Sequence, residues 1–415
     1  MTPSSKSPSQ PRYRFVRKHW HWLFAVIDAI GEFLARTVAK IRRRPPTLLK
    51  DGDVRRVLLV QLDHFGDAVM TTSLLPGLRD RFPQATIDVL CAPWNQEIFT
   101  RREVARIYIS RWNRFNRKLG WLWPTSTFYW GWKLRGRKYD VAIDVRGEFS
   151  VALVMAFCGA KRRVGWPCAG GGFLFTDRVD YVAGRHEVES RHAILRALGS
   201  PTRTIAPPSF TPSPAADRFV THMLGEFLQG DRPLLVMHIG AGTSAKRWPP
   251  EYWRELIGRV VIEFDARVVL VGSAGETETA RAVTQDQFWP GLMDWTGRLT
   301  IDQLAALLRR AEAMIGADSG PAHLAAAVET EVVVLFSGTN DAKQWRPWGE
   351  RVQVLQHGVP CSPCYLPKCR FVDHPCLRGL MPEMVIDALQ TILDGPAILP
   401  MLQTTSRLGH SGENR

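Results

Sequence analysis

The chain has 415 residues, of which 45% are hydrophobic and 23% are charged. This length exceeds one typical domain and suits two domains of roughly 150–200 residues plus extensions. The formal net charge of +14 is concentrated in two segments, because residues 1–50 carry +9 and residues 101–138 carry +10. The sequence therefore predicts two local basic surfaces on an otherwise ordinary globular protein.

The seven cysteines are an odd number, and four of them lie between Cys361 and Cys376. This is not the even disulfide framework of a small secreted domain. The first ten residues are polar, and no small-residue cleavage site follows an apolar stretch. We therefore expect a reducing, cytoplasmic location.

An amphipathic helix is expected near the N-terminus, flanked by basic residues on both sides. Asp28 and Glu32 interrupt its apolar stretch, which disfavours a transmembrane span. The helix can lie on an anionic membrane surface or dock on the body of the protein. Nucleic-acid binding has no recognised module to support it. The apolar residues at helical spacing are Trp20, Leu23, Phe24, Ile27, Ile30, Phe33 and Leu34.

The first α/β half begins after the Pro45-Pro46 pair. Residues 54–62 and 85–93 are predicted strands joined by a loop and a helix, which is a βαβ unit of a parallel sheet. Residues 139–147 form a further predicted strand. The Pro-rich stretch 204–219 marks the expected linker to the second half.

Asp67 follows the first predicted strand in the segment QLDHFGD. One glycine stands where a dinucleotide fingerprint needs three, so a hydride-transfer cofactor is disfavoured. At the start of the next helix, Asp67 can serve as a general base on a hydroxyl or can simply complement the helix dipole. The DGD sequence at 51–53 precedes its strand, so we interpret it as a surface turn and not as a metal-binding D-x-D motif.

A second α/β half starts at residue 232 and suggests two doubly wound halves that face a cleft. Thr243, Ser244 and Lys246 follow its first strand and can donate to phosphate oxygens, or form a solvated basic loop. Glu276 follows the next strand and can accept from ribose hydroxyls, or be a surface acid at a helix start. The predicted elements are strands at 232–242, 266–275, 313–320 and 332–341 and helices at 250–264 and 301–311.

Residues 314–327, MIGADSGPAHLAAA, indicate a strand whose loop opens directly onto a helix. Ser319 can cap this helix, Pro321 is tolerated in its first turn and Gly320 permits close approach. Such a helix start binds anions, although an ordinary strand-to-helix connection looks the same. Its position downstream of Lys246 and Glu276 favours the anion site.

The four clustered cysteines follow the pattern Cys361-x2-Cys364-x4-Cys369-x6-Cys376. Four thiols give the ligand count of a small structural zinc or iron site. The alternative is a set of free cytosolic thiols.

Taken together, these segments resemble glycosyltransferase family 9, the ADP-heptose:lipopolysaccharide heptosyltransferases. The resemblance covers roughly residues 54–392. It implies an α/β fold of the GT-B type, with two Rossmann-like domains facing a central cleft, in addition to the basic N-terminal helix. The motifs that carry it are QLDHFGDAVMTTSLLPGLR, GAGTSAKRWPPEYW, VGSAGETETA, MIGADSGPAHLAAA, VVVLFSGTND and RPWG.

The resemblance implies an inverting transfer of heptose from ADP-heptose to the lipopolysaccharide inner core, with no metal required for catalysis. Asp67 would be the general base, and Thr243, Ser244 and Lys246 would bind the donor diphosphate. Glu276 would contact the ribose. Asp318, Ser319, Gly320 and His323 would line the phosphate and sugar pocket, with Asp318 binding sugar hydroxyls or holding His323.

With this resemblance, we expect an N-terminal extension at 1–50, an acceptor-binding domain at 51–212, a nucleotide-sugar-binding domain at 213–395 and a C-terminal tail at 396–415. An anionic glycolipid acceptor and the inner face of the cytoplasmic membrane are the expected partners, without nucleic acid. Two alternatives stay open: transfer of another nucleotide-activated sugar, and a non-catalytic nucleotide-sugar or glycolipid-binding protein. The basic residues expected to contact the acceptor are Arg111, Arg114, Arg117 and Lys118.

Overall fold

A computed structural model of the chain describes residues 18–42, 51–100, 104–113, 116, 118, 120–201, 204–228, 230–285 and 289–394. Within these ranges it does not describe the side chains of 18–20, 38–42 and 51. The first seventeen residues of the predicted N-terminal extension and the predicted tail at 396–415 lie outside the described residues.

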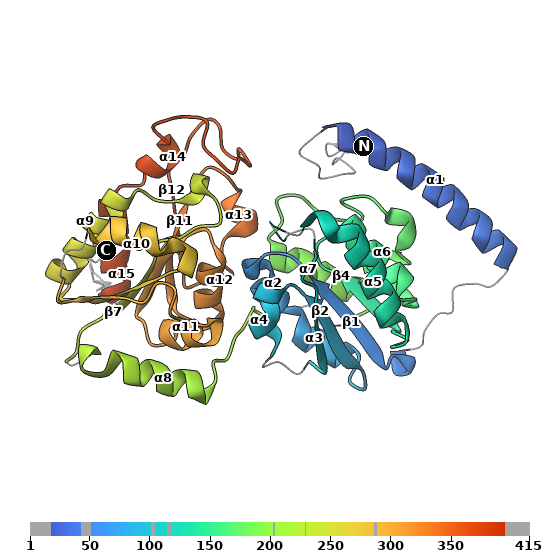
Figure 1. Ribbon diagram of the computed structural model, residues 1–415, viewed down its shortest axis with the longest axis horizontal. Coiled ribbons are helices and arrows are strands. Elements are labelled where there is room, and N and C mark those ends of the chain that lie inside the picture. The colour runs from blue at the N-terminus through green and yellow to red at the C-terminus, as the bar shows by residue number, and fades with distance from the viewer. Residues whose placement is uncertain are drawn as a thin grey trace, which may run out of the picture.

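Two six-stranded parallel sheets form the centres of two α/β domains, which lie side by side in Figure 1. The first sheet has the order β3-β2-β1-β4-β5-β6 and the second the order β12-β11-β10-β7-β8-β9. Counted from its own first strand, each sheet has the doubly wound order 3-2-1-4-5-6. The strands are β1 (Arg56–Gln61), β2 (Thr86–Cys91), β3 (Arg106–Ile109), β4 (Val141–Asp144), β5 (Arg162–Gly165), β6 (Asp177–Arg178), β7 (Leu234–His238), β8 (Arg267–Val271), β9 (Leu292–Asp294), β10 (Ala313–Ala317), β11 (Glu331–Phe336) and β12 (Val352–Gln356).

The central strands are almost entirely buried, as expected for parallel strands covered by helices on both faces. Their apolar runs, such as VLLV in β1 and VVVLF in β11, supply the core of each domain. The helices of the first domain and its extension are α1 (Lys18–Arg42), α2 (Phe65–Thr71), α3 (Leu74–Arg81), α4 (Gln96–Thr100), α5 (Trp123–Arg135), α6 (Phe149–Phe157) and α7 (Glu187–Ala197). Those that follow are α8 (Pro214–Leu224), α9 (Pro250–Glu263), α10 (Thr277–Thr284), α11 (Ile301–Leu308), α12 (Gly320–Ala327), α13 (Ala342–Trp345), α14 (Pro375–Arg378) and α15 (Pro382–Leu393).

The helix predicted between the first two strands is in fact two helices, α2 and α3. Pro76 lies in the first turn of α3, where its missing N–H costs nothing, but a continuous helix would need that N–H as a donor. Likewise, α8 begins at Pro214 within the stretch predicted as linker, with Ser213 as its N-cap. The extended linker is therefore shorter than the sequence suggested.

Helix α1 docks on the first domain through one face. Phe24 packs edge-on against Phe149 of α6, with ring centroids 5.2 Å apart. Asp28 is buried and its Oδ1 accepts from the backbone N–H of Gly171 at 2.7 Å, while Gly31 lies against the Phe173 ring. The docked alternative is therefore correct for this face (Figure 1), although other apolar residues of α1 stay exposed. Among the described helices, none is long and apolar enough to cross a membrane.

Candidate active site

The switch points of the two sheets lie between β1 and β4 and between β7 and β10. In doubly wound folds, ligands bind beside the carboxyl ends of strands at such points. Asp67 follows β1, Lys246 follows β7 and Asp318 follows β10. The fold thus gives three of the sequence-predicted residues the positions where ligands bind.

The N-terminal ends of α2 and α12 pack against each other where the two domains meet (Figure 1). Gly320 lies against the Phe65 ring, and Gly66 lies against the imidazole of His323. A Cβ at Gly66 would stand 2.8 Å from Cδ2 of His323, and a Cβ at Gly320 would overlap Phe65. Both glycines are therefore required for this close approach, which brings Asp67 and His323 to one site.

Asp67 belongs to a buried ionic cluster that the sequence did not predict. Its Oδ1 accepts from Nη2 of Arg191 at 2.8 Å and lies 3.7 Å from Nη1 of Arg146. The same Arg146 nitrogen is 2.8 Å from Oδ2 of Asp63. The side chain of Arg191 is 1% exposed and that of Arg146 is 32% exposed, so Arg191 and the two carboxylates lie in a low-dielectric environment that Arg146 connects to solvent.

The two carboxylates differ in their readiness to ionise. Burial raises the pKa of Asp67, but the positive charges of Arg146 and Arg191 outweigh burial and hold it below its usual value. Burial raises the pKa of Asp63 to about 7, and the negative charge of Asp67 contributes to that rise. At neutral pH Asp67 is therefore ionised and able to accept a proton, whereas Asp63 is only partly ionised.

On the opposite domain, Asp318 pairs with Lys246. Lys246 Nζ donates to Asp318 Oδ2 at 2.5 Å, and Asn340 Nδ2 donates to the same oxygen at 2.9 Å. This pairing accounts for an acid next to an expected diphosphate, because the carboxylate holds the lysine in place. The negative charge of Asp318 also acts on His323, where it favours the protonated imidazole; the roles expected for Asp318, binding sugar hydroxyls or holding His323, stay predictions.

His323 is buried in the first turns of α12. Burial lowers its pKa, in spite of the opposing charges of Asp318 and Asp67. The imidazole is therefore neutral at pH 7 and can both donate and accept a hydrogen bond. Ser319, the N-cap residue, places its Oγ 3.2 Å from Nδ1 of His238, the last residue of β7.

The other predicted donor-binding residues, Thr243, Ser244 and Glu276, lie on the same domain as Lys246, after strands β7 and β8. Thr243 Oγ1 is buried and has no hydrogen-bond partner among the described residues, whereas Ser244 Oγ donates to the carbonyl oxygen of Pro367 at 3.3 Å. Glu276 completes a capping box, because its Oε2 accepts from the backbone N–H of Ser273 at 2.7 Å. Its carboxylate also lies over Gly240 and is 3.8 Å from Nε2 of His238.

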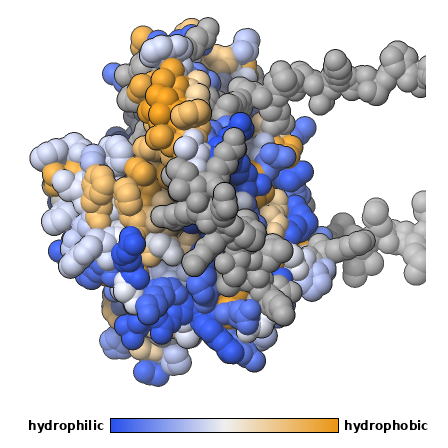
Figure 2. Space-filling view, turned by 90° about the vertical axis from the view of Figure 1, so that its right-hand side faces the viewer, coloured by the Kyte–Doolittle hydropathy of each residue, from blue (hydrophilic) through white to orange (hydrophobic). Residues whose placement is uncertain are grey.

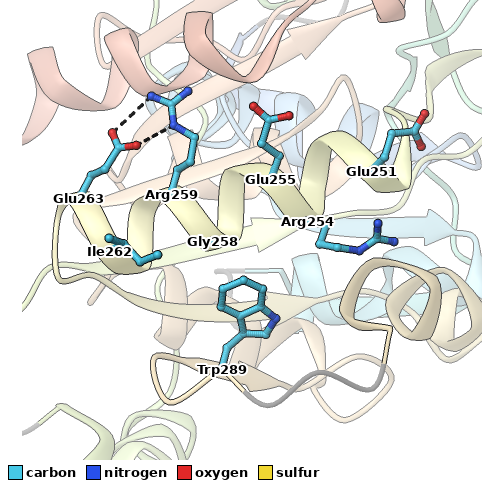
Figure 3. Close-up of a pocket in the computed structure, with 8 residues that line it drawn as sticks. All are labelled: Glu251, Arg254, Glu255, Gly258, Arg259, Ile262, Glu263 and Trp289. Carbon is cyan, nitrogen blue, oxygen red and sulfur yellow. Dashed lines mark hydrogen bonds and ion pairs between the residues drawn. The ribbon is translucent and has the colours of Figure 1, made fainter.

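Two surface cavities lie away from this junction. The first, about 370 Å³, is formed on the outer side of α9 against Trp289 and contains no predicted site residue (Figure 3). The second, about 450 Å³, lies between Arg247, Glu278 and His374. The predicted site residues therefore gather at the junction of the domains and not in either cavity.

The basic residues expected to contact the acceptor are partly described. Arg111 and Lys118 are exposed, while Arg114 and Arg117 lie outside the described residues. Trp112 and Trp121 are exposed in the same region, at 46% and 75%. Charged and aromatic side chains are therefore exposed together at these described positions, and their contact with the acceptor stays a prediction.

The four clustered cysteines lie near one another after β12 without forming a closed site. Burial raises the pKa of the Cys376 thiol, and the other three thiols of the cluster add to that rise. In the part of the chain that the structure describes, no group of three or more His, Cys, Asp or Glu side chains is arranged to hold a metal ion. The donor set suits a soft metal, but this arrangement does not close around one.

Several site residues were missed by the sequence analysis. Arg146 follows β4 at the carboxyl edge of the first sheet, so its position carried a usable signal. His238 ends β7 in the same manner. Arg191 and Glu187 lie one turn apart on α7, and nothing in the pattern of that helix distinguishes them from surface charges.

The two doubly wound domains, which meet where α2 packs against α12, form an α/β fold of the GT-B type. A family model for glycosyltransferase family 9 (heptosyltransferase) matches residues 129–373. The chain belongs to this family of enzymes, which confirms the resemblance found in the sequence.

The relatives are distant and span the whole fold. The chain is 26% identical over 353 residues to lipopolysaccharide heptosyltransferase 2 of Escherichia coli K12, covering 81% of this chain and 98% of that protein. It is 27% identical to lipopolysaccharide heptosyltransferase 1 of Pseudomonas aeruginosa, covering 83% and 99%. The structure of E. coli ADP-heptose lipopolysaccharide heptosyltransferase II superposes with a TM-score of 0.67 at 24% identity, covering 81% and 98%. The two-domain architecture is therefore that of the heptosyltransferases.

Proposed function

We propose that this enzyme transfers heptose from ADP-heptose to a hydroxyl of the lipopolysaccharide inner core, with inversion at the anomeric carbon and with Asp67 as general base. The carrying observation is the junction of α2 and α12, where Asp67 on one domain meets Lys246, Asp318 and His323 near the other domain's helix start. An inverting transfer needs these two elements, a base on the attacking side and a stabilised leaving group. The first domain (51–212) then receives the acceptor and the second (213–395) the donor.

In this proposal the donor diphosphate is held without a metal. Lys246 supplies the positive charge, and the start of α12 at Ser319-Gly320 supplies backbone N–H groups and the positive end of the helix dipole. The buried Oγ1 of Thr243, which no other described residue engages in a hydrogen bond, is a further donor. Ser244 lies beside it, Glu276 accepts from the ribose, and neutral His323 contacts the sugar or the diphosphate.

The transfer is a single displacement. The acceptor oxygen forms a bond to the anomeric carbon while the bond from that carbon to the diphosphate oxygen breaks, and ADP leaves with the electron pair. Asp67 takes the acceptor proton. A carboxylate of low pKa is a weak base toward an alcohol, but the attacking oxygen becomes acidic as its new bond forms, so the proton moves late.

The experiment that decides between the surviving functions is a donor panel. Purified protein is incubated with ADP-heptose, other nucleotide sugars and a lipid A–Kdo acceptor, and free nucleotide and glycosylated lipid are both measured. Turnover of ADP-heptose alone supports the proposal. Turnover of another nucleotide sugar would show that the enzyme transfers that sugar and not heptose. Tight donor binding without transfer to the acceptor would indicate a binding protein.

We also propose that the enzyme works on the inner face of the cytoplasmic membrane. Helix α1 is docked through Phe24, Asp28 and Gly31, and its other side exposes an apolar stripe at helical spacing. Seen from the right-hand side of Figure 1, where α1 lies, the surface of the molecule carries an apolar patch next to strongly hydrophilic residues (Figure 2). A basic, aromatic helix held rigidly against its domain fits an anionic bilayer surface. The exposed side chains are Trp22 (72%), Leu23 (38%), Val26 (38%), Ile30 (56%), Phe33 (70%) and Leu34 (56%).

Replacing Trp22 and Phe33 together with serine should weaken binding to vesicles rich in phosphatidylglycerol at least tenfold, because two aromatic anchors are lost. Co-sedimentation with such vesicles measures it. Ile262→Ser is the matched control, since Ile262 is 77% exposed but lies on α9 of the other domain. Unchanged vesicle binding of the double variant would show that α1 does not bind the membrane.

We propose that the cysteine cluster binds a structural zinc or iron ion, because four soft donors lie within sixteen residues and near one another in space. Protein purified without chelator should carry about one metal ion per chain by elemental analysis, and Cys361→Ser with Cys364→Ser should lose it and melt at lower temperature. Metal-free wild-type protein with an unchanged melting temperature on metal addition would show that these are free thiols.

A further inference from the structure

A chain of hydrogen bonds joins Asp67 to the opposite domain. Arg191 Nη2 donates to Asp67 Oδ1 at 2.8 Å, and its Nη1 lies 3.0 Å from Oε2 of Glu187. The other oxygen of Glu187, Oε1, accepts from Nε2 of Gln344 at 2.8 Å. Gln344 lies on α13, which follows β11 of the second sheet. The chain therefore runs from the first domain to the second through three buried side chains.

The members of this chain are held tightly. Glu187 and Gln344 are 3% and 5% exposed, and Gln344 Nε2 also donates to the hydroxyl of Tyr181 at 2.6 Å, which in turn donates to Glu187 Oε1. Arg191 Nε donates to Oγ1 of Thr71 at 3.2 Å. A buried network of this kind fixes side-chain positions, because each broken hydrogen bond leaves an unsatisfied polar group.

Helix α13 also reaches the second cation next to Asp67. The guanidinium of Arg146 stands over the ring of Trp345, 6.0 Å from its centroid. The next residue, Arg346, accepts at its carbonyl from Nε2 of His186 at 2.9 Å, and His186 precedes Glu187. Both arginines that contact the Asp67 carboxylate therefore depend on contacts with one short segment of the other domain.

We propose that Gln344 is a positioning residue that orients Asp67 through Glu187 and Arg191, so that the base is aligned only while the second domain is docked on the first. This inference rests on the proposed role of Asp67. Both contacts from the arginines go to Oδ1, so the network sets the direction in which Oδ2 is presented to the acceptor hydroxyl. Donor binding by the second domain is thereby linked to the alignment of the base.

The test compares Gln344→Leu with Lys343→Ala in the donor and acceptor assay. Gln344→Leu removes the amide and leaves an apolar side chain that is one bond shorter. We expect kcat to fall at least tenfold, with the KM for the donor changed less than twofold. Lys343 is exposed on the same helix, and its variant should keep wild-type kcat. Glu187→Gln is the second variant, made in case Gln344→Leu fails to fold, and circular dichroism checks both.

A double-mutant cycle separates positioning from general stability. If Gln344 acts through Glu187, the kcat loss of Glu187→Gln combined with Gln344→Leu should be close to that of the larger single variant. Fully additive losses, or wild-type kcat in Gln344→Leu, would overturn the inference. Asp67→Asn is measured alongside: if that variant stays active, the proposed base itself is wrong, whereas an inactive Asp67→Asn with a fully active Gln344→Leu contradicts the positioning role alone.

Discussion

Replacing Asp67 with asparagine should lower kcat for heptosyl transfer about 10³-fold while ADP binding changes less than threefold. General bases contribute roughly 10²–10⁴-fold, and asparagine has nearly the same shape but cannot take the proton. Donor binding is spared because the proposed diphosphate ligands lie on the other domain. Steady-state kinetics give kcat, and calorimetric titration with ADP gives the affinity.

Asp63→Asn is the matched control, because it removes a neighbouring buried carboxylate that pairs with the same arginine, Arg146. We expect it to retain kcat within about tenfold, since no proton transfer is assigned to it. Equal loss in both variants would show that the cluster matters as a unit of charge and not through Asp67. Thermal unfolding accompanies both, because losing one partner of a buried ion pair costs about 3 kcal/mol.

The surrounding charges also set the pH dependence. Arg146 and Arg191 hold the pKa of Asp67 below the usual value of an aspartate. Asp67 therefore stays ionised at every pH above that usual value. In Arg191→Gln the pKa should rise, so protonation inactivates the base at higher pH and the acid limb of the kcat/KM profile moves upward. Arg146, Asp63 and His323 still face Asp67 in that variant.

Lys246→Met should lower kcat/KM for the donor roughly 10²–10³-fold and weaken ADP binding at least tenfold. The reason is the loss of the cation assigned to the leaving diphosphate, an electrostatic contribution comparable to the removal of one oxyanion donor. Methionine keeps most of the apolar part of the lysine side chain. The substitution also removes the ion pair between Lys246 and Asp318, whose atoms are 2.5 Å apart. Both quantities come from the kinetic and calorimetric assays used for Asp67.

Arg247→Ala is the control for Lys246→Met, since Arg247 is the adjacent, exposed cation. We expect its kcat/KM to stay within threefold of wild type. If both variants lose donor binding equally, the loop acts through its overall charge. If Lys246→Met keeps wild-type ADP affinity, the diphosphate lies elsewhere.

Much of the architecture followed from the sequence because parallel strands buried on both faces appear as continuous apolar runs. The strand segments around residues 56–61, 234–238 and 313–317 were located within a few residues for this reason. The break between α2 and α3 was missed, since neither Thr72 nor Ser73 is a glycine or proline and both keep helical backbone angles. Helix α1 was expected, but its docking depends on Phe149 and Gly171, which lie far along the chain.

The site was predictable where a residue follows a strand at the switch point, as Asp67, Lys246 and Asp318 do. The partners of these residues were not predictable, because they come from distant segments. Arg191 reaches Asp67 from α7, and Asn340 reaches Asp318 from the loop after β11. Such pairs are set by tertiary packing, and a single sequence carries no signal for them.

The most direct measurement is the anomeric configuration of the product. Wild-type enzyme is supplied with ADP-heptose and the lipopolysaccharide inner-core acceptor, and the glycosylated product is examined by NMR. We expect one added heptose whose anomeric configuration is opposite to that of the donor, formed by wild type but not by Asp67→Asn. A product with retained configuration, or transfer that persists in Asp67→Asn, would contradict it.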